Sequence, residues 1–476
     1  MRAARSDDAV PGWHAKRACD PAGGCAAAPL RATSLAVQIE LIAPAAAESA
    51  SLPRMGLGIL AALTPPEDEV VYTDEIVRRL DLERDVKDVD LAGISVDSRT
   101  ASRSYAIADA YRRRGVTVVL GGIHATACAE EASAHADAVV VSEAEDAWPR
   151  VLEDFKRGAL RPVYRTPLPS LAGTPAPRRD LFRSWRYIPF QVVQTMRGCP
   201  YPCEFCSVST ANGTTMRFRP ADEVLAELRT VGRRVLFADD NVMIHRAYSR
   251  GLFTRMAPLG KHWIGQCSLA AVRRLENVRL MAESGCKALF IGFESIDDET
   301  VRFTGKRQNR PAEYRETIDM LHDHGISVWG SFVFGFDTDG PEVFDRTVEF
   351  AVDMKLTMAS FAVLTPYPGT ALYRRLLAEG RLTDPRWWLG SDHEAGSPYY
   401  RPTRMTREQL HEGWVRAWTR FYSLGSMWRR FTVRPQSSWV QAFGFWPLNL
   451  MQRRFVRGRI AGSETRAAAA PLPAAC

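Results

Sequence analysis

Short apolar runs alternate with amphipathic segments through the first third of the chain. The runs are rich in Val, Ile and Leu, and they predict buried strands within residues 36–44, 69–77, 90–96, 117–125 and 136–145. Segments with helical periodicity separate them, near residues 56–63, 102–115 and 148–156. Strands joined by crossover helices in this way predict an α/β fold, a doubly wound parallel sheet of the flavodoxin-like type over residues 35–158. Ligands of such sheets bind beyond the carboxyl ends of the strands.

The alternation stops at a proline-rich stretch and then begins again. Residues 159–190 have too little periodic apolar content for a packed element, so we expect them to form a linker. Further strands are predicted near residues 191–198, 234–241, 262–268, 287–295, 327–336 and 358–369, with helices between them. These β/α units in series predict a partial (β/α)6 barrel over residues 191–400. Its chemistry would lie at the carboxyl ends of its strands.

Residues 401–476 are predicted to form a helical C-terminal region with a disordered end. Aromatic side chains recur there at helical spacing, namely Trp414, Trp418, Phe421 and Tyr422. Residues 438–459 mix further aromatics with arginines, which indicates either packing against the domains or a helix at a membrane interface. Gly444 and Pro447 weaken the membrane alternative. At the other end, we expect residues 1–34 to be a disordered leader.

The composition is that of a folded protein with more than one domain. The chain has 476 residues, of which 46% are hydrophobic and 25% are charged. Its net charge of +7 is small for this length, so we expect no nucleic-acid partner. No run of about 18 apolar residues occurs, so we expect no membrane span. The chain has 9 cysteines, and the crowding of a few of them indicates metal or redox chemistry in a reducing compartment, the cytoplasm by default.

The crowded cysteines are Cys199, Cys203 and Cys206, directly after the first strand predicted for the barrel. Soft thiolates favour iron–sulfur clusters, zinc or Cu(I), and three of them leave one metal coordination site open. A structural zinc loop would need a fourth ligand at close spacing, and candidates such as His245 are distant in sequence. The spacing therefore favours an iron–sulfur cluster held by these three thiolates.

The loop C-x-x-x-C-x-aromatic-C, with Phe205 before its last cysteine, resembles that of radical S-adenosylmethionine (SAM) enzymes. Residues 191–380 also follow the strand order of that family. The resemblance implies a [4Fe–4S] cluster in which the thiolates hold three irons, while the amine and carboxylate of SAM chelate the fourth. Electron transfer would then cleave SAM to methionine and a 5′-deoxyadenosyl radical. It also implies an electron donor, such as a flavodoxin, a ferredoxin or a dedicated reductase.

The same resemblance implies further cofactor-binding residues at the ends of barrel strands. Asp239, Asp240 and Asn241 follow the second strand, where the family accepts hydrogen bonds from the methionine ammonium, although a helix N-cap is an alternative. Glu294 ends the fourth strand, where members of the family hold the ribose hydroxyls. Gln266, after the third strand, would line the same pocket or serve in packing.

The combination of a flavodoxin-like domain with this barrel resembles the cobalamin-binding class of radical SAM proteins. That class includes C-methyltransferases and the anaerobic magnesium-protoporphyrin ester cyclase, and the match covers residues 36–425. Ser95 and the pair Gly121 and Gly122 would receive the nucleotide tail of the corrinoid, since glycines permit close approach of the backbone. No D-x-H-x-x-G segment is present, so we expect no lower histidine ligand to cobalt.

Several residues depart from the pattern of the cobalamin-binding class. Ser142 stands where a glycine is common, and Ala129 stands where a proline is usual. Arg99 and Arg103 would face the edge of the corrin ring. A side chain at the first position and two cations near the ring predict that the enzyme works without cobalamin.

On this basis the leading hypothesis is a radical SAM enzyme that abstracts hydrogen from a small polar substrate in natural-product biosynthesis. Without cobalamin, dehydration or another oxidoreductase-type reaction remains, which would resemble the radical diol-dehydratases of aminoglycoside pathways. The alternatives are a cobalamin-dependent C-methyltransferase, a porphyrin-type cyclase and a non-catalytic iron–sulfur protein. No residue set outside the cofactor pocket identifies the substrate or a catalytic group.

Overall fold

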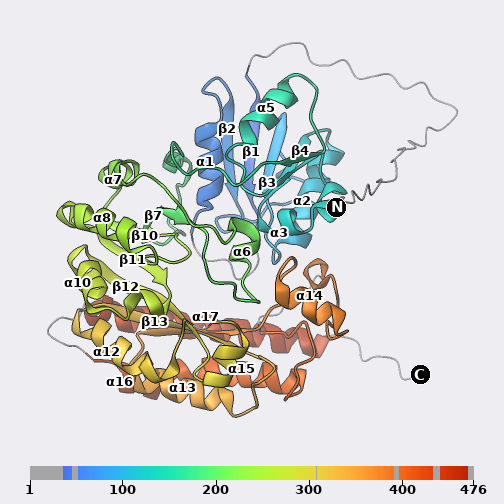
Figure 1. The fold of residues 1–476 in the computed structure, drawn as a ribbon. Coiled ribbons are helices and arrows are strands. Elements are labelled where there is room, and N and C mark those ends of the chain that lie inside the picture. The colour runs from blue at the N-terminus through green and yellow to red at the C-terminus, as the bar shows by residue number, and fades with distance from the viewer. Residues whose placement is uncertain (1–35, 46–51, 307, 391–395, 433–439, 470–476) are drawn as a thin grey trace, which may run out of the picture.

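The computed structural model describes residues 36–45, 52–306, 308–390, 396–432 and 440–469. Two parallel sheets dominate the structure, and a set of C-terminal helices covers the second sheet (Figure 1). The expected leader, residues 1–34, lies outside the described residues, as do Cys19, Cys25 and Cys476.

The first sheet has six parallel strands in the order β2-β1-β3-β4-β5-β6. Its strands are β1 (Gln38–Ala43), β2 (Glu69–Asp74), β3 (Leu91–Ser95), β4 (Thr117–Gly121), β5 (Ala138–Val141) and β6 (Val163–Arg165). Its helices are α1 (Met55–Leu63), α2 (Ala101–Arg113), α3 (Ile123–Ala127), α4 (Ala129–Ser133) and α5 (Trp148–Lys156). Apolar clusters are buried on both faces of the sheet, because the crossover helices cover both. The predicted doubly wound sheet is confirmed.

The sixth strand, β6, lies in the segment that we expected to hold no packed element, and that expectation is wrong. The strand pairs with β5, and Tyr164 at its centre is buried. The Tyr164 hydroxyl donates to a carboxylate oxygen of Asp154 at 2.9 Å. A strand of three residues is too short to show a period in the sequence. A 3-10 turn, η1 (Arg179–Leu181), follows in the same segment.

The second sheet also has six parallel strands, in the order β14-β13-β12-β11-β10-β7. Its strands are β7 (Gln191–Val193), β10 (Arg234–Phe237), β11 (His262–Cys267), β12 (Cys286–Glu294), β13 (Ser327–Phe334) and β14 (Met358–Val363). A short hairpin of β8 (Met196–Arg197) and β9 (Arg217–Phe218), with α6 (Val208–Asn212) between them, follows the first strand. Because β7 and β14 are both edges, the barrel is open, as predicted for a partial (β/α)6 barrel.

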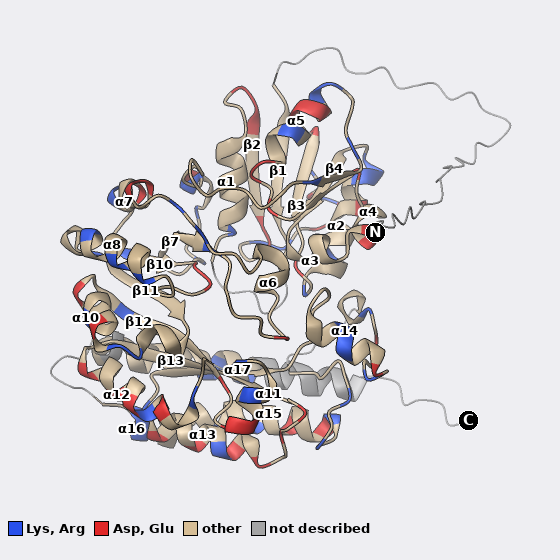
Figure 2. Ribbon diagram, in the orientation of Figure 1, with Lys and Arg blue, Asp and Glu red and all other residues tan. Residues whose placement is uncertain are grey.

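Helices cover the outer face of the second sheet (Figure 1). They are α7 (Ala221–Thr230), α8 (Arg246–Met256), α9 (Leu269–Val272), α10 (Leu275–Glu283), α11 (Asp298–Phe303), α12 (Tyr314–Asp323) and α13 (Val343–Asp353), with 3-10 turns η2 (Ala257–Leu259) and η3 (Pro311–Glu313). Figure 2 shows acidic and basic residues interspersed along the outer helices α10, α12, α13 and α15. This mixture is ordinary for helix faces in contact with water.

The C-terminal region is helical, as predicted. Its described elements are α15 (Arg407–Phe421), α16 (Leu424–Arg430), η5 (Val440–Gly444) and α17 (Phe445–Ala469), and α14 (Ala371–Ala378) and η4 (Trp387–Leu389) precede it. Trp414 and Trp418 each donate from the indole N–H to the backbone oxygen of Phe361 in β14, at 2.8 Å. The aromatic repeat of α15 therefore packs against the edge of the sheet. None of the described helices is long and apolar enough to cross a bilayer.

Gly122, directly after β4, offers a test of how tightly the loops at the end of the first sheet are packed. Its φ is 106°, and a Cβ there would lie 2.7 Å from the backbone oxygen of Val96. Gly115 also has a positive φ, 81°, but a Cβ there meets open space. We expect Gly115→Ala to lower the free energy of unfolding by about 1–2 kcal/mol, the cost of the left-handed conformation. Gly122→Ala should cost about 3 kcal/mol or more, because strain and overlap add.

Chemical denaturation of both variants would measure the difference in the free energy of unfolding. Equal losses for the two variants would mean that the loops can separate to admit a side chain, and that the close approach at Gly122 is not a constraint.

Candidate functional site

The three predicted cluster cysteines lie in one loop, between β8 and α6, at the carboxyl end of the second sheet. Cys199, Cys203 and Cys206 are all half-buried, and none forms a disulfide. Gly198 opens the loop with a φ of 91°, and a Cβ there would lie 2.5 Å from the backbone oxygen of Thr215. A glycine is therefore required where the chain turns into the cysteine loop.

Burial changes the acidity of the cysteine thiols. It raises the pKa of Cys203, and it raises the pKa of Cys206 to about 11. The positive charge of Lys306 opposes this rise at both thiols. Thiols in this state keep their protons at neutral pH, so a metal centre that binds here has to displace them.

Two residues inside the cysteine loop contact side chains that lie later in the chain, after β13 and on α14. The guanidinium of Arg375, on α14, pairs with Glu204 at 2.9 Å and with Asp337, after β13, at 2.7 Å. The ring of Phe205 meets that of Phe336 edge to face, with centroids 5.8 Å apart. Sequence reasoning missed the pair of Glu204 and Arg375, because the two residues are 171 positions apart and each is an ordinary surface residue type.

Asp239 and Asn241 are buried, and their side chains bind neighbouring protein groups. The carboxylate of Asp239 accepts hydrogen bonds from the backbone N–H and the hydroxyl of Thr195, both at 2.6 Å. Burial raises the pKa of Asp239 to about 6. The side-chain oxygen of Asn241 accepts from the backbone N–H of Ser268 at 2.8 Å. Neither residue is the N-cap of α8, which is His245. This geometry favours a positioning role for both residues.

Asp240 and Gln266 lie closer to the cysteine loop. The carboxylate of Asp240 accepts from the backbone N–H of Gly198 at 3.2 Å and from the side-chain amide of Asn212 at 3.1 Å. The amide of Gln266 donates to the backbone oxygen of Asp240 at 3.1 Å. Asp240 therefore fixes the start of the loop, and burial raises the pKa of its carboxyl.

Glu294 ends β12 in an unusual conformation. Its φ is 60°, and the pairing of β12 with β13 shifts register between Gly292 and Glu294. Its carboxylate forms an ion pair with Lys306, whose ammonium also donates to the backbone oxygen of Gly292 at 2.9 Å. A non-glycine residue with positive φ is a sign of strain, and strain of this kind is concentrated at functional sites. Lys306 was not predicted from the sequence, because no motif includes it.

Buried ion pairs join the cysteine loop to the first sheet. Arg197, the last residue of β8, pairs with Glu143 at 2.6 Å and with Glu145 at 2.5 Å. Arg217, from β9, also reaches Glu143, at 2.9 Å between Nη1 and Oε2. Glu143 and Glu145 follow β5 of the first sheet, so the network connects the carboxyl ends of both sheets.

Between these two edges lies a cavity of about 810 Å³. Its walls come from both sheets and include Gly93, Ser95, Gly121, Ser142, Gln194, Arg197, Ala238 and Asp240. This is where the ligand sites of two parallel α/β sheets are expected, beyond the carboxyl ends of their strands.

Two of the four departures from the cobalamin-binding pattern look different in the structure. Arg103 does not face the cavity, because its guanidinium forms an ion pair with Glu75, with Nη2 2.6 Å from Oε1. The prediction that it faces a corrin ring is wrong. Ser142 has a φ of 79°, a conformation typical of glycine, and its backbone N–H donates to Thr126 Oγ1 at 2.9 Å. Arg99 does line the cavity, and it is exposed.

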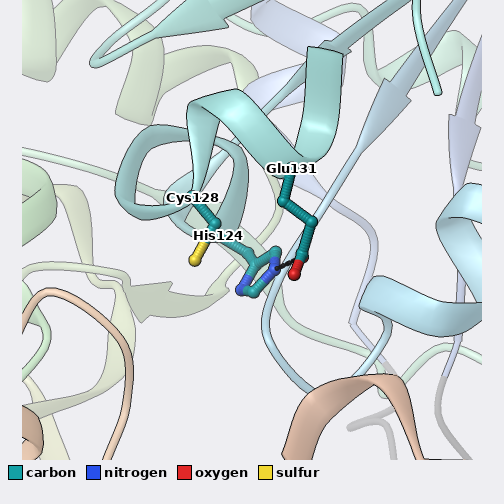
Figure 3. Close-up of side chains that lie close together, drawn as sticks. All are labelled: His124, Cys128 and Glu131. Carbon is teal, nitrogen blue, oxygen red and sulfur yellow. Dashed lines mark hydrogen bonds and ion pairs between the residues drawn. The ribbon is translucent and has the colours of Figure 1, made fainter. Parts of the chain in front are cut away.

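A second group of potential metal ligands lies on α3 and α4 of the first sheet. The ligand atoms of His124, Cys128 and Glu131 lie within 4.8 Å of one another (Figure 3). Both ring nitrogens of His124 are already used, one with Ser98 at 3.0 Å and one with Glu131 at 3.1 Å. The indole of Trp388, on η4, donates to both carboxylate oxygens of Glu131, at 2.9 and 3.1 Å. The group therefore acts as a hydrogen-bonded joint between the first sheet and η4.

The chemistry of these residues fits two groups. Three half-buried thiols with a nearby cation suit a cluster with one open coordination site. The wall of the cavity at Gly121 and Gly122 is backbone without side chains, which suits close approach of a large planar ligand. Arg99 lines the cavity and is exposed to solvent.

Replacing Cys199, Cys203 or Cys206 by Ala is expected to abolish the visible absorbance of the iron–sulfur cluster and the cleavage of SAM. Each variant removes one of only three thiolates available in the loop. The matched controls are the other described cysteines, Cys128, Cys267 and Cys286, whose Ala variants should keep both signals. Absorbance spectra and 5′-deoxyadenosine release from anaerobically reconstituted protein provide the measurement. Loss of the cluster in a control variant would overturn the assignment.

Comparisons with known proteins agree with this geometry. The model of the Radical SAM superfamily matches residues 193–351, the B12 binding domain matches residues 48–152, and a domain of unknown function, DUF4070, matches residues 370–437. The chain is 29% identical to bacteriochlorophyllide d C-12(1)-methyltransferase of Chlorobaculum tepidum over 415 residues. This alignment covers 85% of the chain and 88% of the relative.

Two further matches extend over most of the chain. Bacteriochlorophyllide d C-8(2)-methyltransferase of the same organism is 31% identical over 361 residues, which are 70% of this chain and 78% of the relative. Among solved structures, the radical SAM methyltransferase TsrM from Kitasatospora setae superposes with a TM-score of 0.65 and 16% identity, over 91% of this chain and 100% of that one. The chain therefore belongs to the radical SAM superfamily, in the class that carries an N-terminal B12-binding domain.

Proposed function

We propose that this protein is a cobalamin-dependent radical SAM methyltransferase that methylates a carbon atom of a small organic substrate. The observation that carries the proposal is the cavity into which the ends of both sheets open. A ligand on the first sheet and SAM beside the cysteine loop would share this space. Both relatives named above are methyltransferases by name, which supports methyl transfer over other radical chemistry.

In this proposal SAM binds between the cysteine loop and the cavity. Cys199, Cys203 and Cys206 would hold the cluster, Asp240 lines the cavity, and Gln266 donates to the backbone oxygen of Asp240. A [4Fe–4S] cluster would supply the electron that cleaves SAM, and cobalamin would supply a carrier for the methyl group. An external electron donor is needed to reduce the cluster. The buried pairs of Arg197 fix the cysteine loop relative to the carboxyl end of the first sheet.

The first sheet retains the features that a corrinoid needs. Arg103 no longer counts against cobalamin binding, because Glu75 and the backbone oxygen of Leu80 hold its guanidinium away from the cavity. The objection from Ser142 is weakened, because this residue keeps the backbone conformation of the glycine that it replaces. We therefore infer that cobalamin binds, contrary to the expectation from sequence.

Dehydration in natural-product biosynthesis, the leading hypothesis from sequence, has less support. What supports it is the radical SAM chemistry that it shares with methyl transfer. The hypothesis also rested on the absence of cobalamin, for which the reason based on Arg103 no longer holds and the reason based on Ser142 is weaker. We therefore rank the methyltransferase above it.

We expect Glu294→Gln to weaken SAM binding by about tenfold or more, because charge-assisted hydrogen bonds to the ribose contribute roughly 1.5–3 kcal/mol. The ion pair with Lys306 places the carboxylate next to the cysteine loop, yet outside the set of cluster ligands. The cluster absorbance should not change. Titration of SAM into the reconstituted protein measures the dissociation constant.

The matched control is Glu283→Gln, on the exposed face of α10. The same loss of charge there should leave SAM affinity unchanged. An unchanged dissociation constant in Glu294→Gln would assign Glu294 a purely structural role in the strand end.

The test of the proposed function is a count of cobalt together with an assay of methyl transfer. Protein purified from cells supplied with cobalamin should contain about one cobalt per chain. Ser95→Trp, which fills the cavity wall, should lose cobalt and keep its iron. Arg113→Trp, on the exposed face of α2, is the matched control and should keep both.

With SAM labelled in its methyl group, candidate substrates should acquire the label only when cobalamin is present. Wild-type protein without cobalt that still cleaves SAM would contradict the proposal and return the radical dehydratase hypothesis to first place. Cobalt retained by Ser95→Trp would place the corrinoid elsewhere in the molecule.

A further inference from the structure

The outward surface of α16 and α17 is apolar to a degree that is unusual for a water-exposed helix pair. Large apolar side chains are exposed there and on the adjoining η5, namely Leu424 (51%), Trp428 (69%), Leu450 (40%) and Met451 (57%) on the two helices and Phe443 (80%) on η5. The rings of Trp428 and Trp446 are in contact, with centroids 5.1 Å apart, so the exposed side chains of the two helices form one patch. Contiguous apolar surface of this kind marks an interaction site.

The buried side of the same helices combines apolar side chains such as Met427 and Phe445 with polar groups. Asn449 of α17 is fully buried and donates to the backbone oxygen of Thr357 at 3.1 Å. It also accepts from the guanidinium of Arg430, which is itself fully buried, at 3.0 Å. Arg430 donates to the backbone oxygen of Leu356 at 2.9 Å. These polar contacts fix the orientation of α17, which leaves its remaining apolar side chains, Leu450 and Met451, facing outward.

The charged residues in the first part of α17 have one sign. Residues 440–458 contain no Asp or Glu, and their arginines are Arg453, Arg454 and Arg457. Arg454 and Arg457 are exposed. The acidic residues packed nearby, on α13, are engaged by arginines of α15 and α16, as in the pair of Arg429 with Glu349 at 2.8 Å. The patch therefore combines tryptophan and aliphatic side chains with net positive charge.

We propose that this patch docks the enzyme on the surface of an anionic lipid bilayer. Aromatic and aliphatic side chains beside arginines are the composition of helices that lie at a bilayer interface, where apolar groups enter the headgroup region and cations meet lipid phosphates. No described helix can cross a bilayer, so the contact is peripheral. An apolar protein partner would not require the uniform positive charge, which an anionic surface does.

The test is flotation of the reconstituted holoenzyme with vesicles under anaerobic conditions. The protein should float with vesicles of phosphatidylglycerol and phosphatidylcholine and much less with phosphatidylcholine alone. High salt should reduce the bound fraction, since exposed charges are screened. The pair Trp428→Ser and Met451→Ser should lower partitioning by about tenfold or more, and the pair Arg454→Gln and Arg457→Gln should lower it by about tenfold on the anionic vesicles alone.

Trp185→Ser is the matched control, because Trp185 is the most exposed large apolar side chain in the described part of the chain outside the patch, at 89%. It should float like the wild type, and every variant should still cleave SAM, which shows that it is folded. No flotation of the wild type with anionic vesicles would overturn the proposal. Sedimentation of the wild type as a dimer that the Trp428 and Met451 variant splits, without vesicle binding, would instead identify a second copy of the chain as the occupant. Neither result depends on whether the enzyme transfers methyl groups.

Discussion

The ion pairs of Arg197 are the constraint on which the arrangement of the two sites depends. Arg197 lies two residues before the first cluster cysteine, and its partners Glu143 and Glu145 follow the last residue of β5 in the first sheet. Charges buried in this way are costly unless each is paired, so the two strand ends cannot separate without leaving a buried charge uncompensated. The proposed cofactor on the first sheet and the proposed cluster in the loop would thus be held at a fixed separation. Transfer of a group between them would require such a fixed separation.

The arrangement of the sheets could be predicted from sequence because period-2 and period-3.6 patterns are local. Each parallel strand is a short apolar run, and each crossover helix shows its own stripe, so the order of elements follows directly. The cysteine loop was equally accessible, since its three ligands fall within eight residues. The strand β6 was not predicted, because three residues are too few to show an alternation of apolar and polar positions. Its burial also depends on Asp154, whose carboxylate accepts a hydrogen bond from Tyr164.

The roles of single polar residues were harder to predict, because they depend on partners far away in the chain. Asp239 lies at a strand end, as a ligand-binding residue would, but its carboxylate accepts hydrogen bonds from the backbone N–H and the hydroxyl of Thr195. Arg103 looked like an obstacle to cobalamin until its partner Glu75 was known. The sequence shows where a charged residue lies along the chain. Its tertiary contacts decide in which direction the side chain points.

The C-terminal helices show how one region can serve two surfaces. The aromatic repeat of α15 closes the edge of the second sheet through Trp414 and Trp418, whose indoles share the backbone oxygen of Phe361. The next helices add hydrogen bonds of Asn449 and Arg430 to the apolar contacts of their inner face. The large apolar side chains on their outer face remain in contact with water. A second apolar phase would remove that surface from water, and a bilayer with anionic headgroups provides such a phase beside the arginines.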